Sequence, residues 1–167
     1  SFEKELLIDD DYRSSNNKSL DRFLSPINQS TNFIFSKFFR KITKDKNKST
    51  KILEIKGRNL EIKNFYDGVV KFNFDELCDR NLGSEDYICI ANTCDFIFIK
   101  DLPNFKENNS NQQQRFITLI DILYEKKIPL MITSHINLNL INSSKSLQEP
   151  FKRTISRLYE LTSINYN

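Results

Sequence analysis

Two continuous apolar runs constrain the fold of this chain more than any other feature of its sequence. The first is "DFIFIKDLP", which ends at Pro103, and the second is "IPLMITSH", which ends at His135. Strands that are buried on both faces of a sheet have such unbroken runs. Between them, "RFITLIDILYEKK" places Phe116, Ile120 and Leu123 at helical spacing. Strand, helix and strand in this order predict a βαβ unit, whose parallel strands need helices on the faces of the sheet.

An alternating pattern precedes this unit. Between residues 51 and 74, apolar and polar residues alternate around Gly57 and Gly68, two residues typical of turns. We therefore predict a three-stranded antiparallel meander there. Helical spacing begins at Asp75 and resumes after Ser84, which is a good N-cap residue. The predicted fold class is α/β: a βαβ unit of parallel strands with covering helices, preceded by a small antiparallel β meander.

The first 50 residues read as an entry segment. Leu6–Ile8 predict a short strand that ends at Asp9–Asp11, and residues 14–31 predict a polar loop. Residues 32–44 predict a basic amphipathic helix, with a charged linker after it. Such a helix can lie on a membrane surface, but the commoner arrangement is a surface helix docked on its own domain. The apolar face of this helix consists of Phe35, Phe38, Phe39 and Ile42.

Length and composition limit the number of domains and the classes of protein to which the chain can belong. The 167 residues are enough for one domain core, which we divide into residues 1–50, 51–74, 75–163 and a tail at 164–167. No run of about 18 apolar residues is present, so the sequence predicts no membrane span. A net charge of +3 is too small to indicate nucleic-acid binding by itself. The chain begins without Met, and we expect it to be a piece of a longer protein.

The three cysteines and the one histidine could form a Cys3His zinc site. Cys78, Cys89, Cys94 and His135 have poor spacing for it, however, and a small buried hydrophobe is the commoner role of such cysteines. Ser134 and His135 also lack the aspartate partner and the nucleophile elbow of a hydrolase triad. We therefore predict no metal site and no catalytic residue in this segment.

The ends of the two apolar strands resemble part of a P-loop NTPase. One strand ends in Asp101 and the other in Thr133-Ser134, like the Walker B and sensor strands that hold Mg²⁺ and position the attacking water. The chain nevertheless contains no GxxxxGK[ST] motif, whose backbone and lysine cradle the phosphates. We expect this segment to be unable to bind and hydrolyse nucleotide alone.

The closing stretch "EPFKRTISRLYELTS" carries Arg153 and Arg157 four residues apart. On an isolated helix, like charges at this spacing repel by about 0.2–0.5 kcal/mol. The two arginines can be solvated surface charges, with Glu160 offsetting part of the repulsion. Alternatively they face an anion, because the donor fork of arginine suits phosphate and carboxylate. That anion is either a nucleotide or a carboxylate within the fold that pins the helix, and the sequence leaves the choice open.

Six segments together resemble the C-terminal half of the AFG-like/ZapE family of P-loop ATPases, which are mitochondrial in eukaryotes and act in cell division in bacteria. In chain order they are "DDDYR", "IKGRNLEI", "VVKFNFDELCDRNLGSEDYICIA", "DFIFIKDLP", "QRFITLIDILYEKKIPLMITS" and "FKRTISRLYELTS". The resemblance implies an AAA+-like ATPase in which ATP and Mg²⁺ are bound mainly by a region upstream of Ser1. Arg153 and Arg157 are our candidates for γ-phosphate sensors or subunit-interface arginines, and Arg115 and Arg13 are weaker ones.

The same resemblance sets expectations for partners and location. It implies protein clients, a homo-oligomer, peripheral membrane association and no nucleic-acid partner. It places the protein in mitochondria, at the inner membrane or on the matrix side, if the source is eukaryotic, and in the cytoplasm if it is bacterial. The alternative function is a non-catalytic interaction module that binds clients through the meander and the Phe-rich helix. Nucleic-acid binding through the mild basic cluster at residues 37–51 is a third, weaker hypothesis.

Overall fold

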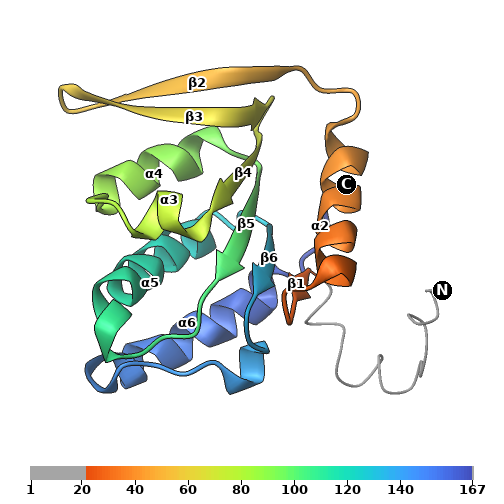
Figure 1. Ribbon diagram of the computed structural model, residues 1–167. Coiled ribbons are helices and arrows are strands. Elements are labelled where there is room, and N and C mark those ends of the chain that lie inside the picture. The colour runs from red at the N-terminus through yellow and green to blue at the C-terminus, as the bar shows by residue number, and fades with distance from the viewer. Residues whose placement is uncertain (1–21, 167) are drawn as a thin grey trace.

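One sheet of six strands runs through the computed structural model, which describes residues 22–166 (Figure 1). The strand order is β1-β6-β5-β4-β3-β2. β4, β5, β6 and β1 are parallel, whereas β3 pairs antiparallel with both β2 and β4. The strands are β1 (Phe23–Leu24), β2 (Lys48–Ile55), β3 (Arg58–Tyr66), β4 (Val69–Asn73), β5 (Phe96–Leu102) and β6 (Leu130–Ser134).

The predicted βαβ unit is confirmed. β5 and β6 are parallel neighbours, with Ile97 opposite Leu130 and Ile99 opposite Ile132. The helix between them is α5 (Ser110–Glu125). A second βαβ unit precedes it, because β4 is parallel to β5 and α4 (Ser84–Thr93) lies in the connection between the two strands.

The predicted meander is correct in its turns and wrong in its limits. Gly57 and Gly68 have φ angles of 82° and 101°, a left-handed conformation that glycine adopts without steric cost. The first strand, however, begins at Lys48, inside the stretch predicted as a linker. The third strand ends at Asn73, because Phe74 is the first residue of α3 (Phe74–Cys78). Since β4 also pairs with β5, the meander is continuous with the parallel sheet.

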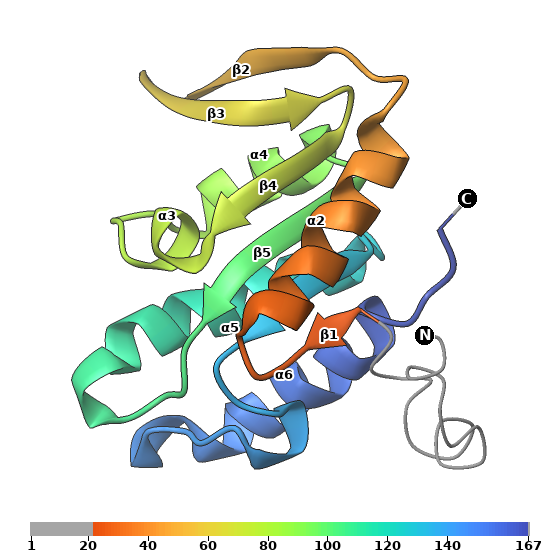
Figure 2. The ribbon, with the colours of Figure 1, turned by 45° about the vertical axis from the view of Figure 1, so that its right-hand side comes forward.

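Two helical layers enclose the sheet (Figures 1 and 2). α2 (Gln29–Thr43) covers one face, and its Phe35 and Phe39 form a small core with sheet residues that include Phe98. α3, α4, α5 and α6 (Gln148–Leu161) cover the other face and share the larger core. Within the described residues, three short 3₁₀ turns join these elements: η3 (Glu107–Asn109), η4 (Leu138–Leu140) and η5 (Lys145–Leu147).

The Phe-rich helix docks on its own domain, as the commoner interpretation expected. Phe35 and Phe39 are buried against the sheet, so this face of the helix is not available to a membrane. The helix begins three residues earlier than predicted, because the side chains of Asn28 and Thr31 cap each other's backbone N–H groups. The loop predicted for residues 14–31 is therefore wrong for β1 and for the first turn of α2.

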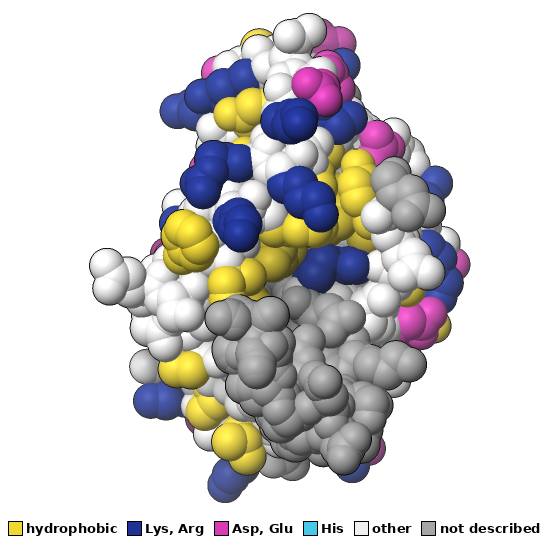
Figure 3. Space-filling view, turned by 90° about the vertical axis from the view of Figure 1, so that its right-hand side faces the viewer, with side chains coloured by type: hydrophobic (Ala, Val, Ile, Leu, Met, Phe, Trp, Pro, Cys, Tyr) yellow, Lys and Arg dark blue, Asp and Glu magenta, His cyan; other side chains and the backbone are white. Residues whose placement is uncertain are grey.

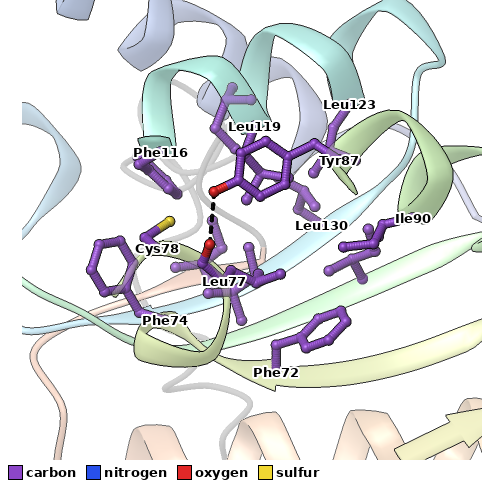
Figure 4. Close-up of a cluster of buried hydrophobic side chains, with 14 of the residues drawn as sticks. Phe72, Phe74, Leu77, Cys78, Tyr87, Ile90, Phe116, Leu119, Leu123 and Leu130 are labelled. Atoms are coloured by element: carbon purple, nitrogen blue, oxygen red, sulfur yellow. Dashed lines mark hydrogen bonds between the residues drawn. The ribbon is translucent and has the colours of Figure 1, made fainter. Parts of the chain in front are cut away.

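The larger core lies between the sheet and α3, α4 and α5 (Figure 4). Tyr87 of α4 is fully buried there, and its hydroxyl donates a hydrogen bond to the Leu77 carbonyl oxygen at 2.7 Å. The N-cap of α4 is Gly83, not the predicted Ser84, because the Asp86 carboxylate reaches back to accept the Gly83 N–H at 2.8 Å. Within residues 22–166 no helix is long and apolar enough to cross a membrane. The predicted strand at Leu6–Ile8 and its aspartates lie outside the described residues.

Candidate functional site

Both arginines of the closing helix converge on one carboxylate of α5. Arg157 Nη1 donates a hydrogen bond to Asp121 Oδ1 at 2.5 Å. Arg153 Nη2 lies 3.7 Å from Asp121 Oδ2, which is an ion-pair distance without a hydrogen bond. The arginines therefore have an anion within the fold, and the interpretation of both as purely solvated charges is wrong.

The two arginines differ in how much of their donor capacity this carboxylate uses. The Arg157 side chain is 22% exposed, and its guanidinium carbon lies 4.5 Å from the centre of the Tyr124 ring. Hydrogen bond and cation–π contact together fix its position. The Arg153 side chain is 55% exposed, and among residues 22–166 its charge contact is the long one to Asp121. Arg157 is thus held in the helix interface, whereas more than half of the Arg153 side chain is open to solvent.

Local helix geometry brings these groups together. Phe151, Thr154, Leu158 and Leu161 are the buried residues of α6, so that this helix packs through an apolar stripe. Arg153 and Arg157 lie one turn apart beside that stripe. On α5, Asp121 and Tyr124 are likewise one turn apart, at a spacing that puts both on one face. The facing helices therefore present a carboxylate and an aromatic ring to the two guanidinium groups.

A second polar group flanks this contact. Glu160 accepts hydrogen bonds from Lys127 Nζ at 2.8 Å and from the Tyr124 hydroxyl at 3.0 Å. The charge of Arg157 also acts on Glu160, as expected, but its effect on the pKa of Glu160 is smaller than that of these hydrogen bonds. The hydrogen bond from Lys127 is the main reason why the pKa of Glu160 is lowered, and the same bond raises the pKa of Lys127. Tyr124 therefore links the Arg157 contact to the Glu160 contact, and both connect α5 to α6.

The other two candidate arginines lie elsewhere. Arg115 Nη1 donates a hydrogen bond to the Cys78 carbonyl oxygen at 3.0 Å, so it binds the last residue of α3. This contact satisfies a carbonyl that the short helix leaves unpaired. Arg13 lies outside the described residues. The structure therefore groups Arg153 with Arg157 and places Arg115 in a separate contact.

The carboxyl ends of β5 and β6 bring the Walker B-like residues side by side. Asp101 has a φ angle of 67° at a register shift of the β5–β6 pair, and its N–H donates to Thr133 Oγ1 at 3.0 Å. The Ser134 hydroxyl donates to the Ile136 carbonyl at 2.7 Å. Thr133 and Ser134 are buried, whereas Asp101 and His135 are exposed. The hydroxyls of Thr133 and Ser134 thus hydrogen-bond to the backbone of the chain itself.

β1, which sequence reasoning missed, completes this edge of the sheet. It pairs in parallel with β6, and the turn Ser25–Asn28 leads from it into α2. Strand, turn and helix are the parts of a P-loop, and ligands of open α/β sheets bind at the carboxyl ends of the strands. Here the turn reads "SPIN", without glycine or lysine, and Asn28 and Thr31 cap the helix. A two-residue strand gives no periodic signal, so only the pairing with β6 identifies it.

The cysteines and the histidine of the zinc alternative do not form a ligand cluster in the described part of the chain. Residues 22–166 contain no group of three or more His, Cys, Asp or Glu side chains that could hold a metal ion. Cys78 and Cys94 are buried free thiols, and Cys89 is half-buried. Burial raises the pKa of the Cys94 thiol to about 12, with a smaller contribution from Asp95. Such thiols stay protonated, as small hydrophobic core residues do.

Comparisons with known proteins agree with the resemblance. The family model described as AFG1-like ATPase matches residues 8–167. The cell division protein ZapE of Escherichia coli K12 is 26% identical over 156 residues, which are 93% of this chain and 42% of ZapE. Lactation elevated protein 1 homolog B of Danio rerio is 30% identical over 82 residues, 49% of this chain and 16% of that protein. The chain thus spans less than half the length of these relatives. No solved structure matches it.

Proposed function

Since the chain belongs to the family of AFG1-like ATPases, we propose that it is the C-terminal portion of a protein that couples ATP hydrolysis to the handling of protein clients. The family match over residues 8–167 carries this proposal. ATP and Mg²⁺ bind mainly to the part of the protein upstream of this segment. The self-capped turn between β1 and α2 supports that division, because it offers no glycine nest and no lysine to a phosphate.

This segment contributes to ATP hydrolysis through an arginine side chain of α6. Arg153 is the first candidate, because its guanidinium is 55% exposed and has only a 3.7 Å contact within the fold. Arg157 orients α6 through Asp121 and keeps Arg153 in place. An arginine that stabilises the charge on a transferring phosphoryl group is worth about 10³–10⁵ in turnover in known systems. Arg153 would act on nucleotide bound by the upstream part or by a neighbouring subunit of a homo-oligomer.

The test compares variants of the protein that includes its upstream ATP-binding part. Arg153→Ala should lower kcat of ATP hydrolysis by at least roughly tenfold while thermal stability stays unchanged. Lys152→Ala is the matched control, since Lys152 is the exposed neighbour and pairs only with Glu149 at 2.9 Å. Unchanged kcat in Arg153→Ala, with the oligomeric state intact, would end the sensor role. A loss only of oligomerisation would assign Arg153 to the subunit interface instead.

Location and process follow from the relatives rather than from the fold. The Escherichia coli relatives carry the name cell division protein, and for a bacterial source we propose a cytoplasmic protein of cell division. For a eukaryotic source we propose the mitochondrion, at the inner membrane or on the matrix side, with peripheral membrane association. Fluorescent tagging of the whole protein in its own cell type tests either location.

A non-catalytic interaction module is the second candidate function. It is favoured by β2, an edge strand whose first five residues, 48–52, are all exposed. Edge strands and open sheet surfaces are common sites for protein partners. This function predicts that the chain alone captures clients without nucleotide. A pulldown that succeeds with the whole protein and fails with this chain contradicts it.

A further inference from the structure

The face of the sheet that carries α2 also carries three lysines from three different strands. Lys48 in β2 is directly opposite Tyr66, and Tyr66 packs on Phe39 of α2. Lys71 in β4 has its ammonium 4.6 Å from the centre of the Phe39 ring. Lys100 in β5 follows Phe98 by two residues, and side chains two residues apart point to the same face. The three lysines therefore share the surface beside α2.

We call Lys48, Lys71 and Lys100 the lysine surface, and within residues 22–166 no ion pair neutralises it. Burial lowers the pKa of Lys71, and the neighbouring charges of Lys100 and Lys48 lower it further. The fold thus keeps a half-buried cation beside two like charges. Its cation–π contact with Phe39 offsets only part of that cost.

The extent of the lysine surface limits what it can bind. β2 and β5 are three strand spacings apart, which is roughly 14 Å at about 4.8 Å per spacing. A single phosphate or carboxylate cannot reach all three lysines across that width. The register adds a displacement along the strands, because Lys48 is level with Val69 whereas Lys100 is level with Asn73, four residues or roughly 13 Å further on. About six residues of an extended polypeptide, at roughly 3.3 Å each, can span this diagonal. The surface therefore fits several anionic groups in a row.

The residues around the lysine surface favour an acidic polypeptide segment over a nucleic acid or an anionic membrane. Glu54 and Glu61 lie on the same face of the β2–β3 hairpin, since Leu53, Ile55, Leu60 and Ile62 point into the larger core. A nucleic-acid strand carries a negative charge at every nucleotide and continues past the lysines, so it meets more of this acidic surface than a short acidic segment does. Ile52, 55% exposed, also lies on this face and offers an apolar contact. Lys71 is recessed beside Phe39, where a flat bilayer reaches it poorly.

We propose that the lysine surface beside α2 is a docking site for an acidic segment of a protein partner, about six residues in length and extended diagonally across β5, β4, β3 and β2. Figure 3 shows lysine and arginine side chains gathered over the neighbouring α2 side of the molecule, with few acidic ones between them. Their charge attracts an acidic segment at a distance, and the exposed Lys48, together with the half-buried Lys71 and Lys100, holds it. The inference is independent of the proposed ATPase function, because it concerns binding without nucleotide.

The probe is a fluorescently labelled peptide of six glutamates, with a peptide of six glutamines as its neutral control. Binding to the chain is measured by fluorescence anisotropy at low and at physiological salt. The triple variant Lys48→Gln, Lys71→Gln, Lys100→Gln should bind the acidic peptide at least roughly tenfold more weakly. The matched control is Lys37→Gln, Lys41→Gln, Lys44→Gln, which removes the same charge from exposed positions on and directly after α2. It should weaken binding less than roughly threefold.

Two further measurements distinguish a loss of binding from a loss of folding, and an acidic peptide from other anionic ligands. Lys71→Met retains the aliphatic stem and should keep or raise the melting temperature while it weakens peptide binding. Vesicles with an anionic lipid and a six-nucleotide single-stranded RNA are tested with the same variants. Equal losses in the two triple variants would overturn the proposal. So would no binding of the glutamate peptide at low salt, or stronger dependence on Lys71 for vesicles or RNA than for the peptide.

Discussion

The guanidinium of Arg58 in β3 lies 2.6 Å from the carboxylate of Asp86 in α4, whose side chain is only 1% exposed. The same carboxylate accepts the Gly83 N–H at the start of α4. Asp86 therefore caps a helix and connects that helix to the protruding β2–β3 hairpin. The neighbouring pair of Lys56 and Glu85 adds a second contact, between two exposed side chains.

Asp86 should make stability depend on acid pH. Burial alone would raise the pKa of Asp86, but the Arg58 contact and the Gly83 N–H together lower it. A lowered folded-state pKa stabilises the fold above the unfolded pKa of about 3.9, and this stabilisation is lost as the pH falls through the folded value. Urea unfolding should show Asp86→Asn less stable than the natural chain at pH 7, with a difference that shrinks below about pH 4. Glu85→Gln, at an exposed pair, should change stability by less than about 0.5 kcal/mol at either pH.

Substitution of Arg157 should lower the free energy of unfolding more than substitution of Arg153. Arg157→Ala removes a charge-assisted hydrogen bond and a ring contact between α5 and α6, and should lower the free energy of unfolding by about 1–2 kcal/mol. Arg153→Ala removes only a long, exposed contact and should cost less than about 0.5 kcal/mol.

A double-mutant cycle checks the assignment of that stability. In an Asp121→Asn background, Arg157→Ala should cost clearly less than it does alone, because the partner charge is already gone. Equal costs in the two backgrounds would show that Arg157 stabilises α6 through its ring contact with Tyr124 and not through Asp121.

Sequence patterns predict this fold where one residue type repeats over a whole element. The apolar runs of β5 and β6 and the helical spacing of α5 are such repeats, and they fix the βαβ unit. β1 has only Phe23 and Leu24, and it is a strand only because β6 lies beside it. In the long elements, the apolar positions that face the core can be predicted from the spacing within the element itself. The element that packs against them need not be known.

The arginine contact shows the same limit at the candidate site. Periodicity places Arg153 and Arg157 on one side of their helix, but it does not say which helix that side meets. Asp121 is 36 positions away from Arg157 and lies on a helix whose apolar spacing predicts burial. Only the packing of α5 against α6 decides that a carboxylate of the fold is the anion. The lysine surface arises in the same way, because the pairing of β4 with β5, which no sequence pattern indicates, brings Lys100 beside Lys71.

Gly68 should tolerate substitution far less than Gly57, although both have a positive φ. A Cβ at Gly68 would lie 2.3 Å from Asp95 Oδ2, whereas a Cβ at Gly57 has nothing within 4 Å. Gly57→Ala should therefore cost only the backbone strain, about 1 kcal/mol. Gly68→Ala should cost more, because the Asp95 side chain or the turn must also move. Denaturant unfolding measures both, and Asp95→Ala in the Gly68→Ala background should recover part of the loss. No recovery would place the strain in the backbone of the turn alone.

Tyr87 should stabilise the core through its hydroxyl as well as its ring. The hydroxyl donates to the Leu77 carbonyl oxygen at 2.7 Å in a site from which water is excluded (Figure 4). Tyr87→Phe keeps the ring packing but leaves that carbonyl without this donor, and it should lower the free energy of unfolding by about 1–2 kcal/mol. Tyr159→Phe is the control, because its hydroxyl contacts Asn139 at 3.2 Å on the exposed surface, and it should change little. Equal effects of the two variants in urea unfolding would show that the buried hydrogen bond contributes no more than a surface one.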